Sequence, residues 1–384
     1  MRRTQGKKTH SPARPRRVHR HQGSSSSYHR TERTRHSGPE RYWVLSFTRG
    51  LEPFVREQLH RHQCELLSTP RTDEEITCRG GEPLGRALQS IRTATALFRA
   101  ITLPVERPRG ITSYEYDGVL RSLFEEVFRL TSLRRFTALR LEGAGKHTPT
   151  FQRLGDHFAR MTTLPYRPVD EEADLVIRLR RSTITSGWEV LVRTTPRPLA
   201  TRDWRVKNMR GAISGPLAAA IIQLARPAAD ETVLNLPCGS GTILAELLEI
   251  APVHRAIGLD IAPETLDAAW QNLTKWRNRS TLQLLQGDLQ HLPLADNAAS
   301  LILSDPPWGE ALSTRTTAAR LNRDMLGEMY RVLSPDGRLI VITQHYRALE
   351  QAAAPLFERE RVLHVFQGGF HPHIIVFQKK RDRG

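Results

Sequence analysis

The second half of the chain alternates between strand and helix patterns, and this alternation constrains the fold more than any other feature. Short apolar runs are each followed by a segment with apolar residues at helical spacing, and turn-forming residues separate the two. We expect strands at residues 232–236, 256–259, 282–285, 301–303 and 338–343, and helices at residues 211–225, 242–250, 263–276 and 318–333. This order predicts an α/β fold with a doubly wound, mostly parallel sheet.

The end of the chain departs from the alternation. Two strand patterns, at residues 362–366 and 374–377, are joined by a loop that contains Gly368 and Gly369. A connection this short predicts a hairpin, so the sheet should end in an antiparallel strand. The histidines beside this turn are expected at the surface and not as metal ligands.

Four of the expected strands end in residues that suit a ligand. The first is followed by a glycine turn and a helix start, whose backbone N–H groups can hold a carboxylate. The next two end in acids that can accept hydrogen bonds from ribose hydroxyls and from an adenine amino group. Leu244 stands where a dinucleotide fingerprint has its third glycine, which disfavours NAD. The pattern predicts an S-adenosylmethionine site made of Pro237, Cys238, Gly239, Ser240, Gly241, Thr242, Asp260, Ile261, Asp288 and Leu289.

The fourth strand end is the stretch Ser304-Asp305-Pro306-Pro307-Trp308-Gly309. The lone pair of an exocyclic amino group is drawn into the ring of its base, which makes the nitrogen a poor nucleophile. Hydrogen bonds to the Asp305 carboxylate and the Pro306 carbonyl would favour a pyramidal nitrogen that faces the methyl donor. Pro307 restricts the direction of that carbonyl, and Trp308 can stack on the base. We therefore predict that Asp305, Pro306, Pro307 and Trp308 catalyse methylation of an amino group.

The first 200 residues divide into three parts. Residues 1–39 are rich in Arg, His, Ser and Pro and poor in apolar side chains, which predicts a disordered basic tail. Residues 40–100 follow a strand–helix–strand–strand–helix order that predicts a small α+β layer. A second α+β unit is expected over residues 101–198, and the catalytic half over residues 199–384.

The positive charge of the chain predicts an anionic partner. The formal net charge is +17, and nucleic acid is the commonest partner of so basic a protein. Residues 1–40 hold 11 Lys and Arg and two Glu, so the remainder is basic as well. Candidate RNA contacts are Lys146 in a glycine-containing loop, Arg178 and Arg180 on an expected strand, and Arg202 and Arg205 at the start of the catalytic half.

Several classes of protein are disfavoured. The three cysteines form no Cys-x-x-Cys pair, which argues against zinc or disulfide frameworks and fits a reducing compartment. No apolar run approaches the about 18 residues of a membrane span. We expect a monomeric cytoplasmic protein without a bound metal or a membrane segment. The Arg- and Ser-rich N-terminus leaves an organellar transit peptide open as an alternative.

Two stretches of the catalytic half resemble known motifs. Residues 237–242 and 304–309 are similar to the donor and catalytic motifs of the THUMP-domain RNA guanine-N2 methyltransferases, and most of all to their tRNA branch. The chain departs from the usual pattern at Trp308, where Tyr or Phe is more common, and at Pro237, where the family often has Asp. The first change keeps a stacking ring, whereas the second removes a carboxylate from the donor site.

The resemblance extends to the first half. Residues 47–52 resemble the start of the ferredoxin-like domain of that family, and residues 168–179 resemble the end of a THUMP domain. Residues 201–205 and 217–220 resemble the lead-in to its catalytic domain. The resemblance implies a Rossmann-like methyltransferase domain preceded by a ferredoxin-like and THUMP RNA-binding half. It also implies S-adenosylmethionine as the cofactor and transfer to N2 of a guanosine in tRNA.

Three other functions stay open. An adenine-N6 methyltransferase of RNA or DNA can carry Asp-Pro-Pro-Trp, although many such enzymes place it before the glycine loop, and here the loop comes first. A ribosomal RNA guanine-N2 methyltransferase differs little in sequence from a tRNA enzyme. An RNA-binding protein with an inactive methyltransferase fold should have lost donor groups, yet the two glycines and three acids are all present.

Overall fold

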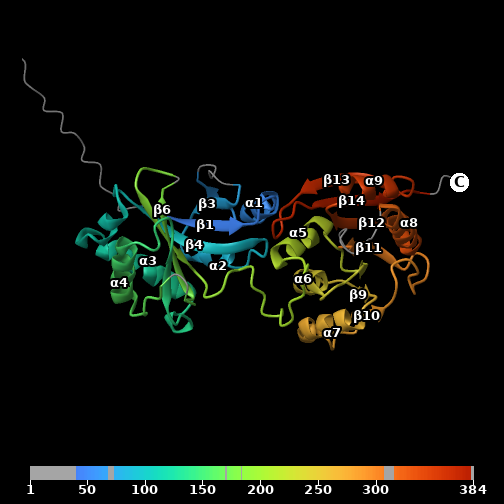
Figure 1. The fold of residues 1–384 in the computed structure, drawn as a ribbon, viewed down its shortest axis with the longest axis horizontal. Coiled ribbons are helices and arrows are strands. Elements are labelled where there is room, and N and C mark those ends of the chain that lie inside the picture. The colour runs from blue at the N-terminus through green and yellow to red at the C-terminus, as the bar shows by residue number, and fades with distance from the viewer. Residues whose placement is uncertain (1–39, 68–72, 169–170, 183, 307–314, 382–384) are drawn as a thin grey trace, which may run out of the picture. The chain divides into compact units, whose positions relative to one another are not determined.

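The computed structural model contains two seven-stranded sheets, one in each half of the chain (Figure 1). It describes residues 40–67, 73–168, 171–182, 184–306 and 315–381, except for the side chains of residues 315–318. The tail predicted at residues 1–39 lies outside the described residues, as do Pro307 and Trp308 of the predicted catalytic motif. The α/β class expected from the sequence is confirmed.

The first sheet combines the strands of residues 41–193. These strands are β1 (Arg41–Phe47), β2 (Glu65–Leu66), β3 (Glu75–Arg79), β4 (Ala94–Leu103), β5 (Leu139–Glu142), β6 (Leu175–Arg181) and β7 (Trp188–Arg193). Their order is β2-β3-β1-β4-β7-β6-β5, and neighbours are antiparallel except for the parallel pair β5 and β6. The helices of this half are α1 (Glu52–Arg61), α2 (Glu82–Leu88), α3 (Asp117–Leu130) and α4 (Pro149–Thr162), with 3-10 turns η1 (Pro108–Thr112), η2 (Tyr114–Tyr116) and η3 (Leu133–Arg135).

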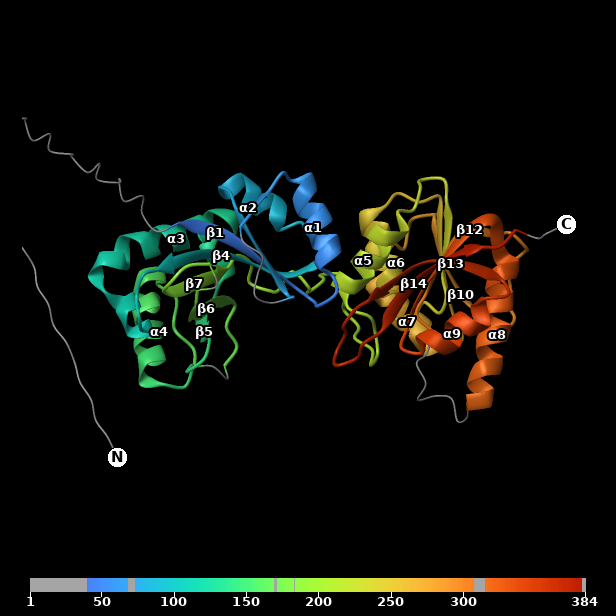
Figure 2. The same cartoon turned by 90° about the horizontal axis from the view of Figure 1, so that it is seen from above.

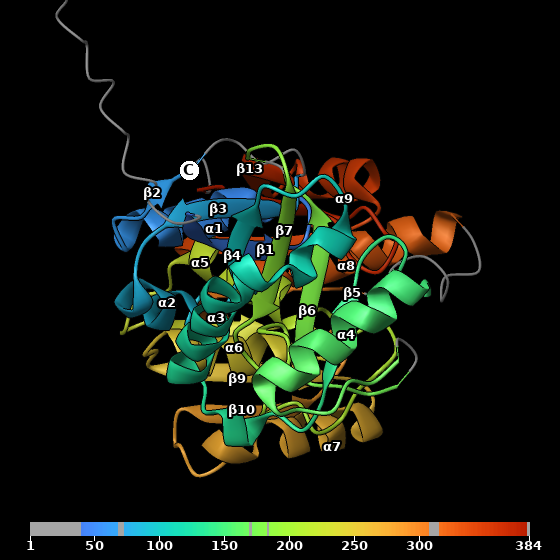
Figure 3. The ribbon, with the colours of Figure 1, turned by 90° about the vertical axis from the view of Figure 1, so that its left-hand side faces the viewer.

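Two hydrophobic cores hold these helices against the first sheet. One core packs α1 and α2 against β1, β3 and β4 around Trp43 and Leu97. The other packs α3 and α4 against β4 to β7 around Phe124 and Phe158. Figure 3 shows α3 and α4 side by side in front of these strands. Because β4 contributes to both cores, the boundary that we predicted at residue 100 falls inside one continuous strand.

The second sheet has the order β10-β9-β8-β11-β12-β14-β13. Its strands are β8 (Thr232–Asn235), β9 (Arg255–Asp260), β10 (Leu282–Gln286), β11 (Ala299–Ser304), β12 (Leu333–Thr343), β13 (Phe357–His364) and β14 (His373–Lys379). Strands β8 to β12 are parallel, and β14 is antiparallel to both β12 and β13. The parallel sheet with an antiparallel end is therefore confirmed.

Helices cover both faces of the second sheet. They are α5 (Gly215–Ala225), α6 (Thr242–Ile250), α7 (Pro263–Asn272), α8 (Arg315–Val332) and α9 (Tyr346–Ala353), with the 3-10 turn η4 (Thr274–Trp276). One face packs under α5, α6 and α7 in a core that includes Leu244 of α6 and Leu303 of β11. The other face packs under α8 and α9 in a core that includes Met325 of α8 and Leu349 of α9. Such double winding aligns the ends of the parallel strands along one edge.

Strand β12 begins earlier than expected. The sequence predicted a turn at residues 335–337 and a strand from residue 338, but the strand already starts at Leu333. Its pairing with β11 shifts there, since Ala299 pairs with Leu333 and Leu301 pairs with Arg338. Residues 335–337 thus form a bulge-like irregularity inside the strand. The sequence pattern of Pro and Gly does not distinguish such an irregularity from a turn that ends a strand.

Helix α1 also joins the core of the second half. Leu51 and Phe54 belong to the same buried cluster as Leu217 of α5. Gly50 has a φ of +90°, and a Cβ at this position would lie 2.5 Å from the carbonyl oxygen of His364. Glycine therefore permits both the left-handed backbone and the close approach to the end of β13.

Candidate active site

The parallel strands bring the predicted site residues to one edge of the second sheet. Strands β8, β9, β10 and β11 are mutually parallel neighbours, so their carboxyl ends lie next to one another. Figure 2 shows this sheet between α5 and α8. The glycine loop follows β8, Asp260 ends β9, Asp288 follows β10 and Asp305 follows β11. Their placement at this edge is the arrangement that ligands of open α/β sheets require.

The glycine loop between β8 and α6 depends on two left-handed glycines. Gly239 has a φ of +51° and Gly241 a φ of +78°. A Cβ at Gly241 would lie 3.1 Å from a methyl group of Leu273, whereas one at Gly239 would meet no atom within 4 Å. The backbone N–H of Cys238 donates to the carbonyl oxygen of Leu259 at 2.8 Å, which ties the loop to β9. The loop is thus packed on one side and open beside Gly239.

Asp260 joins the glycine loop to the end of β9. Its carboxylate accepts hydrogen bonds from the backbone N–H groups of Gly239 at 3.0 Å and Ala262 at 3.2 Å. A carboxylate has about four acceptor positions, so capacity remains for ligand hydroxyls. The side chain of Ile261 is 64% exposed, an unusual position for a large apolar group at a strand end.

The predicted residues after β10 have two different environments. Asp288 is half-buried and accepts a hydrogen bond from the backbone N–H of Gln290 at 2.9 Å. Its other carboxylate oxygen lies 4.0 Å from Nδ1 of His291. Leu289 packs against the core under α8 and α9. Asp288 is therefore placed at the strand edge, while Leu289 mainly supports the turn.

Asp305 follows β11 in a half-buried position. Burial raises the pKa of its carboxyl group to about 7. The hydroxyl of Ser304 donates to the carbonyl oxygen of Leu236, which joins the ends of β11 and β8. Between the same strands, Nδ2 of Asn235 donates to the carbonyl oxygen of Leu303 at 3.0 Å. The position of Asp305 is thus braced from β8.

Asn235 is a site residue that sequence reasoning missed. Its side chain is 1% exposed, and Nδ2 also lies within 3.3 Å of the carbonyl oxygen of Pro237. Oδ1 has no hydrogen-bond partner among the described residues. In the sequence, Asn235 could have been found as the single amide inside an otherwise apolar strand. Such an amide indicates a specific role, because buried amides form hydrogen bonds.

A cavity of about 140 Å³ joins the glycine loop to Asp305. It is lined by Met209, Arg210, Gly211, Ala212, Ile213, Pro237, Cys238, Gly239, Ser240, Thr242, Ile243 and Asp305. The segment 209–213 was not predicted as part of the site. The sequence predicted a helix from Gly211, but Gly211 has a φ of +80° in a turn and α5 begins only at Gly215. Complete small-molecule sites span about 300–1,000 Å³, so this cavity can enclose one end of an elongated ligand. Asp260 and Asp288 do not line it and lie along the same edge.

The arginines predicted on β6 have partners inside the first half. Arg178 pairs with Glu75 at 3.0 Å, and Arg180 pairs with Glu75 and Glu189 at 2.6 Å each. Their side chains keep 29% and 23% of their exposed area, so contact with RNA stays a prediction. Lys146 is exposed in the loop before α4.

Arg202 and Arg205 have a structural role. Arg202 is 8% exposed, pairs with Glu246 of α6 at 2.6 Å and donates to the carbonyl oxygen of Arg92 at 2.7 Å. Arg205 donates to the hydroxyl of Thr242 at 2.9 Å. Burial lowers the pKa of both guanidinium groups. Both side chains thus contact α6, Arg202 from a buried position and Arg205 from a half-buried one, and contact of either with RNA stays a prediction.

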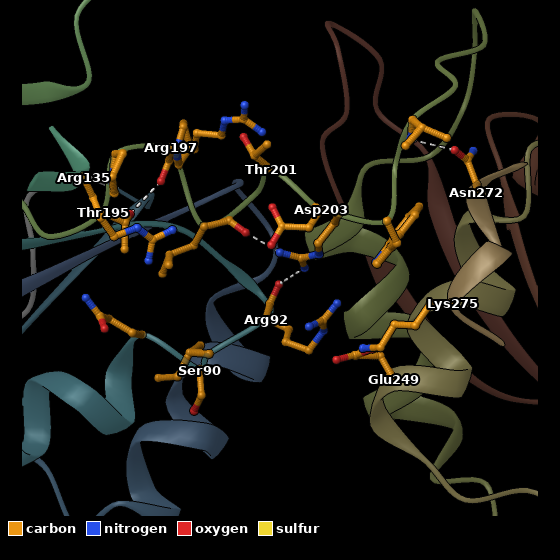
Figure 4. A pocket seen from close by; sticks show the side chains of 18 of the residues that line it. Ser90, Arg92, Arg135, Thr195, Arg197, Thr201, Asp203, Glu249, Asn272 and Lys275 are labelled. Carbon is orange, nitrogen blue, oxygen red and sulfur yellow. Dashed lines mark hydrogen bonds and ion pairs between the residues drawn. The ribbon is translucent and has the colours of Figure 1, made fainter. Parts of the chain in front are cut away.

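A larger pocket of about 1300 Å³ lies beside the segment 195–206. Figure 4 shows Arg135 and Arg197 toward one end, and Lys275 with Glu249 at the other. Lys275 and Glu249 form an ion pair of 2.6 Å. None of the residues predicted to bind the cofactor lines this pocket, so it is separate from the cavity at Asp305.

The described part of the chain contains no cluster of three or more His, Cys, Asp or Glu that could hold a metal ion. Among the same residues there is also no helix with both the length and the apolar character that a bilayer span requires. The three cysteines are free thiols.

Comparison with known proteins agrees with this geometry. Residues 202–373 match the family model described as UPF0020: RMKL-like, methyltransferase domain. The chain is 28% identical over 250 residues to the tRNA (guanine(6)-N2)-methyltransferase of Thermus thermophilus. This match covers 62% of this chain and 74% of that protein. It is 30% identical over 234 residues to the U6 snRNA (guanine-N(2))-methyltransferase THUMPD2 of Bos taurus, which covers 59% of this chain but only 45% of that protein.

The fold as a whole also recurs. The crystal structure of TrmN from Thermus thermophilus superposes with a TM-score of 0.65 and 22% sequence identity, covering 88% of this chain and 100% of that one. The similarity in fold therefore extends over both halves and is not confined to the second sheet.

Proposed function

We propose, on the premise that residues 202–373 form an RMKL-like methyltransferase domain of family UPF0020, that this protein methylates N2 of a guanosine in tRNA with S-adenosylmethionine. The observation that carries the proposal is the cavity that both the glycine loop and Asp305 line. Two relatives that are named as RNA guanine-N2 methyltransferases support the choice of guanine and of RNA.

The strand edge fits the donor molecule. S-adenosylmethionine, when bound, supplies an electrophilic methyl group on a positively charged sulfur. The open side of Gly239 leaves room for its amino-acid end in the cavity. The spare acceptor positions of Asp260 suit ribose hydroxyls, and exposed Ile261 offers an apolar surface to the adenine. Asp288 is placed to accept from the adenine amino group.

Asp305 would orient the amino group of the target base. Its carboxylate and the carbonyl of Pro306 accept hydrogen bonds from the two N–H groups, which turns the nitrogen lone pair toward the methyl group. In-line placement of this kind can contribute about 7–11 kcal/mol to catalysis. After transfer the nitrogen carries a positive charge, and its surplus proton passes to the Asp305 carboxylate. A carboxyl group with a pKa of about 7 is a suitable acceptor at neutral pH.

The remaining features of the proposal follow from the sequence. Pro307 and Trp308 complete the catalytic motif, with Trp308 stacked on a base that has been turned out of its helix. We propose a basic tail over residues 1–39, a ferredoxin-like domain over residues 40–100 and a THUMP domain over residues 101–198. The catalytic domain follows over residues 199–384. We also propose a cytoplasmic monomer that needs no metal; the free thiols fit a reducing compartment.

Nucleoside mass spectrometry tests this function. Purified protein is incubated with unmodified tRNA transcripts and S-adenosylmethionine, and the RNA is digested to nucleosides. We expect N2-methylguanosine with the wild type and none with Asp305→Asn. N6-methyladenosine would instead establish the adenine alternative.

Other RNAs are also tested, and U6 snRNA is one of them because one relative is named for it. Ribosomal RNA and U6 transcripts are offered beside tRNA at equal concentration. Methylation confined to either of these would refute the choice of tRNA while keeping the chemistry. If no RNA is methylated but the donor still binds, the protein is an RNA-binding module with an inactive transferase fold.

A further inference from the structure

Five rings form a row at the end of the second sheet. The ring row consists of Tyr346, His373, His364, Phe366 and His371. Successive ring centroids lie 4.9 Å, 4.9 Å, 5.1 Å and 4.5 Å apart in this order. The first three rings are nearly parallel, with interplanar angles of 23° and 29°. His364 and His371 are also neighbours, with centroids 5.9 Å apart and an interplanar angle of 27°, so the last three rings form a compact group at one end of the row. The rings have the spacing of stacked aromatic groups and stack on one another.

The ring row lies at the edge where the methyl group would be transferred. His373 pairs with Thr343 at the carboxyl end of β12, and Ser304, next to Asp305, pairs with Val341 of the same strand. Strand β14 is the second strand from β11, and strands are about 4.8 Å apart, so the lateral offset is about 10 Å. The row is therefore within reach of nucleotides that neighbour a base held at Asp305.

The rings are accessible, unlike rings that only fill a core. His364 and His371 are exposed, and the other three are half-buried. Phe370, in the turn between β13 and β14, is 51% exposed. Nδ1 of His373 has no hydrogen-bond partner among the described residues. Burial lowers the pKa of His373, so this ring is uncharged at neutral pH.

Cationic groups accompany the rings. The guanidinium carbon of Arg49 lies 4.7 Å from the centre of the Phe366 ring, and Arg49 also pairs with Asp73 at 3.3 Å. Arg359 donates to the hydroxyl of Tyr346 at 2.7 Å and also pairs with Glu350. Arg347 is exposed on α9, one residue after Tyr346. Flat rings next to arginines are the combination with which proteins bind single-stranded nucleic acid, because bases stack on the rings and phosphates pair with the cations.

We propose that the ring row binds unpaired nucleotides that flank the target guanosine, by stacking their bases on His364 and its neighbours. This inference rests on the proposed function. A protein partner fits the row less well, since stable protein interfaces bury a broader and more apolar patch. Bases that stack here would hold the RNA strand open on one side of the target and so stabilise its entry into the site.

Exposed His364 allows a test that leaves the core intact. His364→Ala removes the central ring, and His364→Phe keeps a flat ring without the imidazole nitrogens. His254→Ala is the matched control. His254 is an exposed histidine of the same half that immediately precedes β9, so it lies away from the carboxyl ends of the parallel strands. Two quantities are measured for each protein: steady-state kinetics on tRNA, and affinity for a short single-stranded RNA that contains 2-aminopurine.

We expect His364→Ala to raise the KM for tRNA and the Kd for the single-stranded RNA by about 5- to 100-fold, with kcat changed less than about threefold. His364→Phe should restore both constants, and His254→Ala should leave them unchanged. Quenching of 2-aminopurine fluorescence should be lost only in His364→Ala, since quenching reports stacking.

The outcomes separate this inference from the proposed function. Unchanged KM, Kd and quenching in His364→Ala would overturn the ring row as a stacking site, even if the wild type methylates guanosine. Loss of single-stranded RNA binding in His364→Ala, with no guanosine methylation by the wild type, would uphold the stacking site and reject the proposed function.

Discussion

The proposed role of Asp305 requires a negative charge on a carboxyl group that is shielded from water. Removal from water raises the pKa of its carboxyl group to about 7. Below this pH the carboxyl group is protonated, and it loses capacity to accept both hydrogen bonds and the proton released by the methylated nitrogen. A bound sulfonium would favour the carboxylate and lower the pKa, because opposite charges stabilise the ionised form.

The activity of the enzyme should therefore rise with pH. We expect kcat/KM for RNA to increase through a midpoint of about 7 and to level off above it, with the midpoint of kcat lower because the donor is bound. Above that midpoint, Asp305→Asn should reduce kcat by about 100- to 10,000-fold while the Kd of the donor changes only a few fold, and the difference in kcat should shrink as the pH falls. A wild-type profile that is flat between about pH 5.5 and 8.5 would contradict this role.

The same residue should reduce stability at high pH. A carboxyl group with a raised pKa stabilises the fold fully below its unfolded pKa of about 3.9, and this contribution is lost as pH rises through about 7. At about pH 8, the free energy of unfolding in urea should consequently be about 1–3 kcal/mol higher for Asp305→Asn than for the wild type. At about pH 4 the difference should nearly vanish. If wild type and Asp305→Asn unfold at equal urea concentrations at both pH values, burial is excluded as the cause of the raised pKa.

At the scale of elements, the glycine loop depends on the backbone angles of two glycines. It links β8 to α6 within a few residues, and its two glycines adopt backbone angles that other residues avoid. A Cβ added at Gly241 would lie 3.1 Å from a methyl group of Leu273, in the segment after α7. Its shape therefore depends on both backbone freedom and the absence of a side chain.

Gly241→Ala tests this dependence. The left-handed backbone costs about 1–2 kcal/mol, and the new Cβ at 3.1 Å from Leu273 should also displace the loop. We expect the Kd for S-adenosylmethionine to rise at least about tenfold, measured by calorimetry. Gly369→Ala is the matched control, since Gly369 has a φ of +87° and a Cβ added there would meet no atom within 4 Å. Equal donor affinity in both variants would show that Leu273 does not restrain the loop.

At the scale of the whole molecule, a buried ionic cluster joins the two halves. Glu246 of α6 is fully buried and accepts from Arg92, which precedes β4, at 2.7 Å and from Arg202 at 2.6 Å. The cluster therefore connects the first half, the segment before α5 and the helix that follows the glycine loop. Breaking a buried pair is costly because the remaining charge stays away from water.

Glu246→Gln should reveal this connection. We expect it to lower the free energy of unfolding by about 3–5 kcal/mol, because Arg92 and buried Arg202 lose their counter-charge. Glu249→Gln on the same helix is the control, since its exposed pair with Lys275 should contribute about 0–1 kcal/mol. Urea unfolding followed by circular dichroism gives both values. Similar losses of unfolding free energy in the two variants would show that the buried cluster stabilises the fold no more than the exposed ion pair does.

Local pattern was enough to predict much of this protein. The apolar period of the strands predicted the second sheet. The glycines at residues 239 and 241 and the acids at strand ends predicted the edge on which the candidate ligand groups meet. These features are readable because strand and helix periods, turn residues and strand ends are properties of a few consecutive residues. The antiparallel end of the sheet was predictable for the same reason, since a short glycine loop permits only a hairpin.

Only the tertiary structure decided which charged and aromatic groups are available. Arg202 looked like an RNA contact in the sequence, but Glu246, 44 residues later, buries it in an ion pair. The segment 209–213 became part of the site because the chain passes back over the glycine loop, and the ring row formed because β13 and β14 pair beside β12. Burial and pairing depend on residues far apart in the chain, so they follow from packing and not from any local pattern.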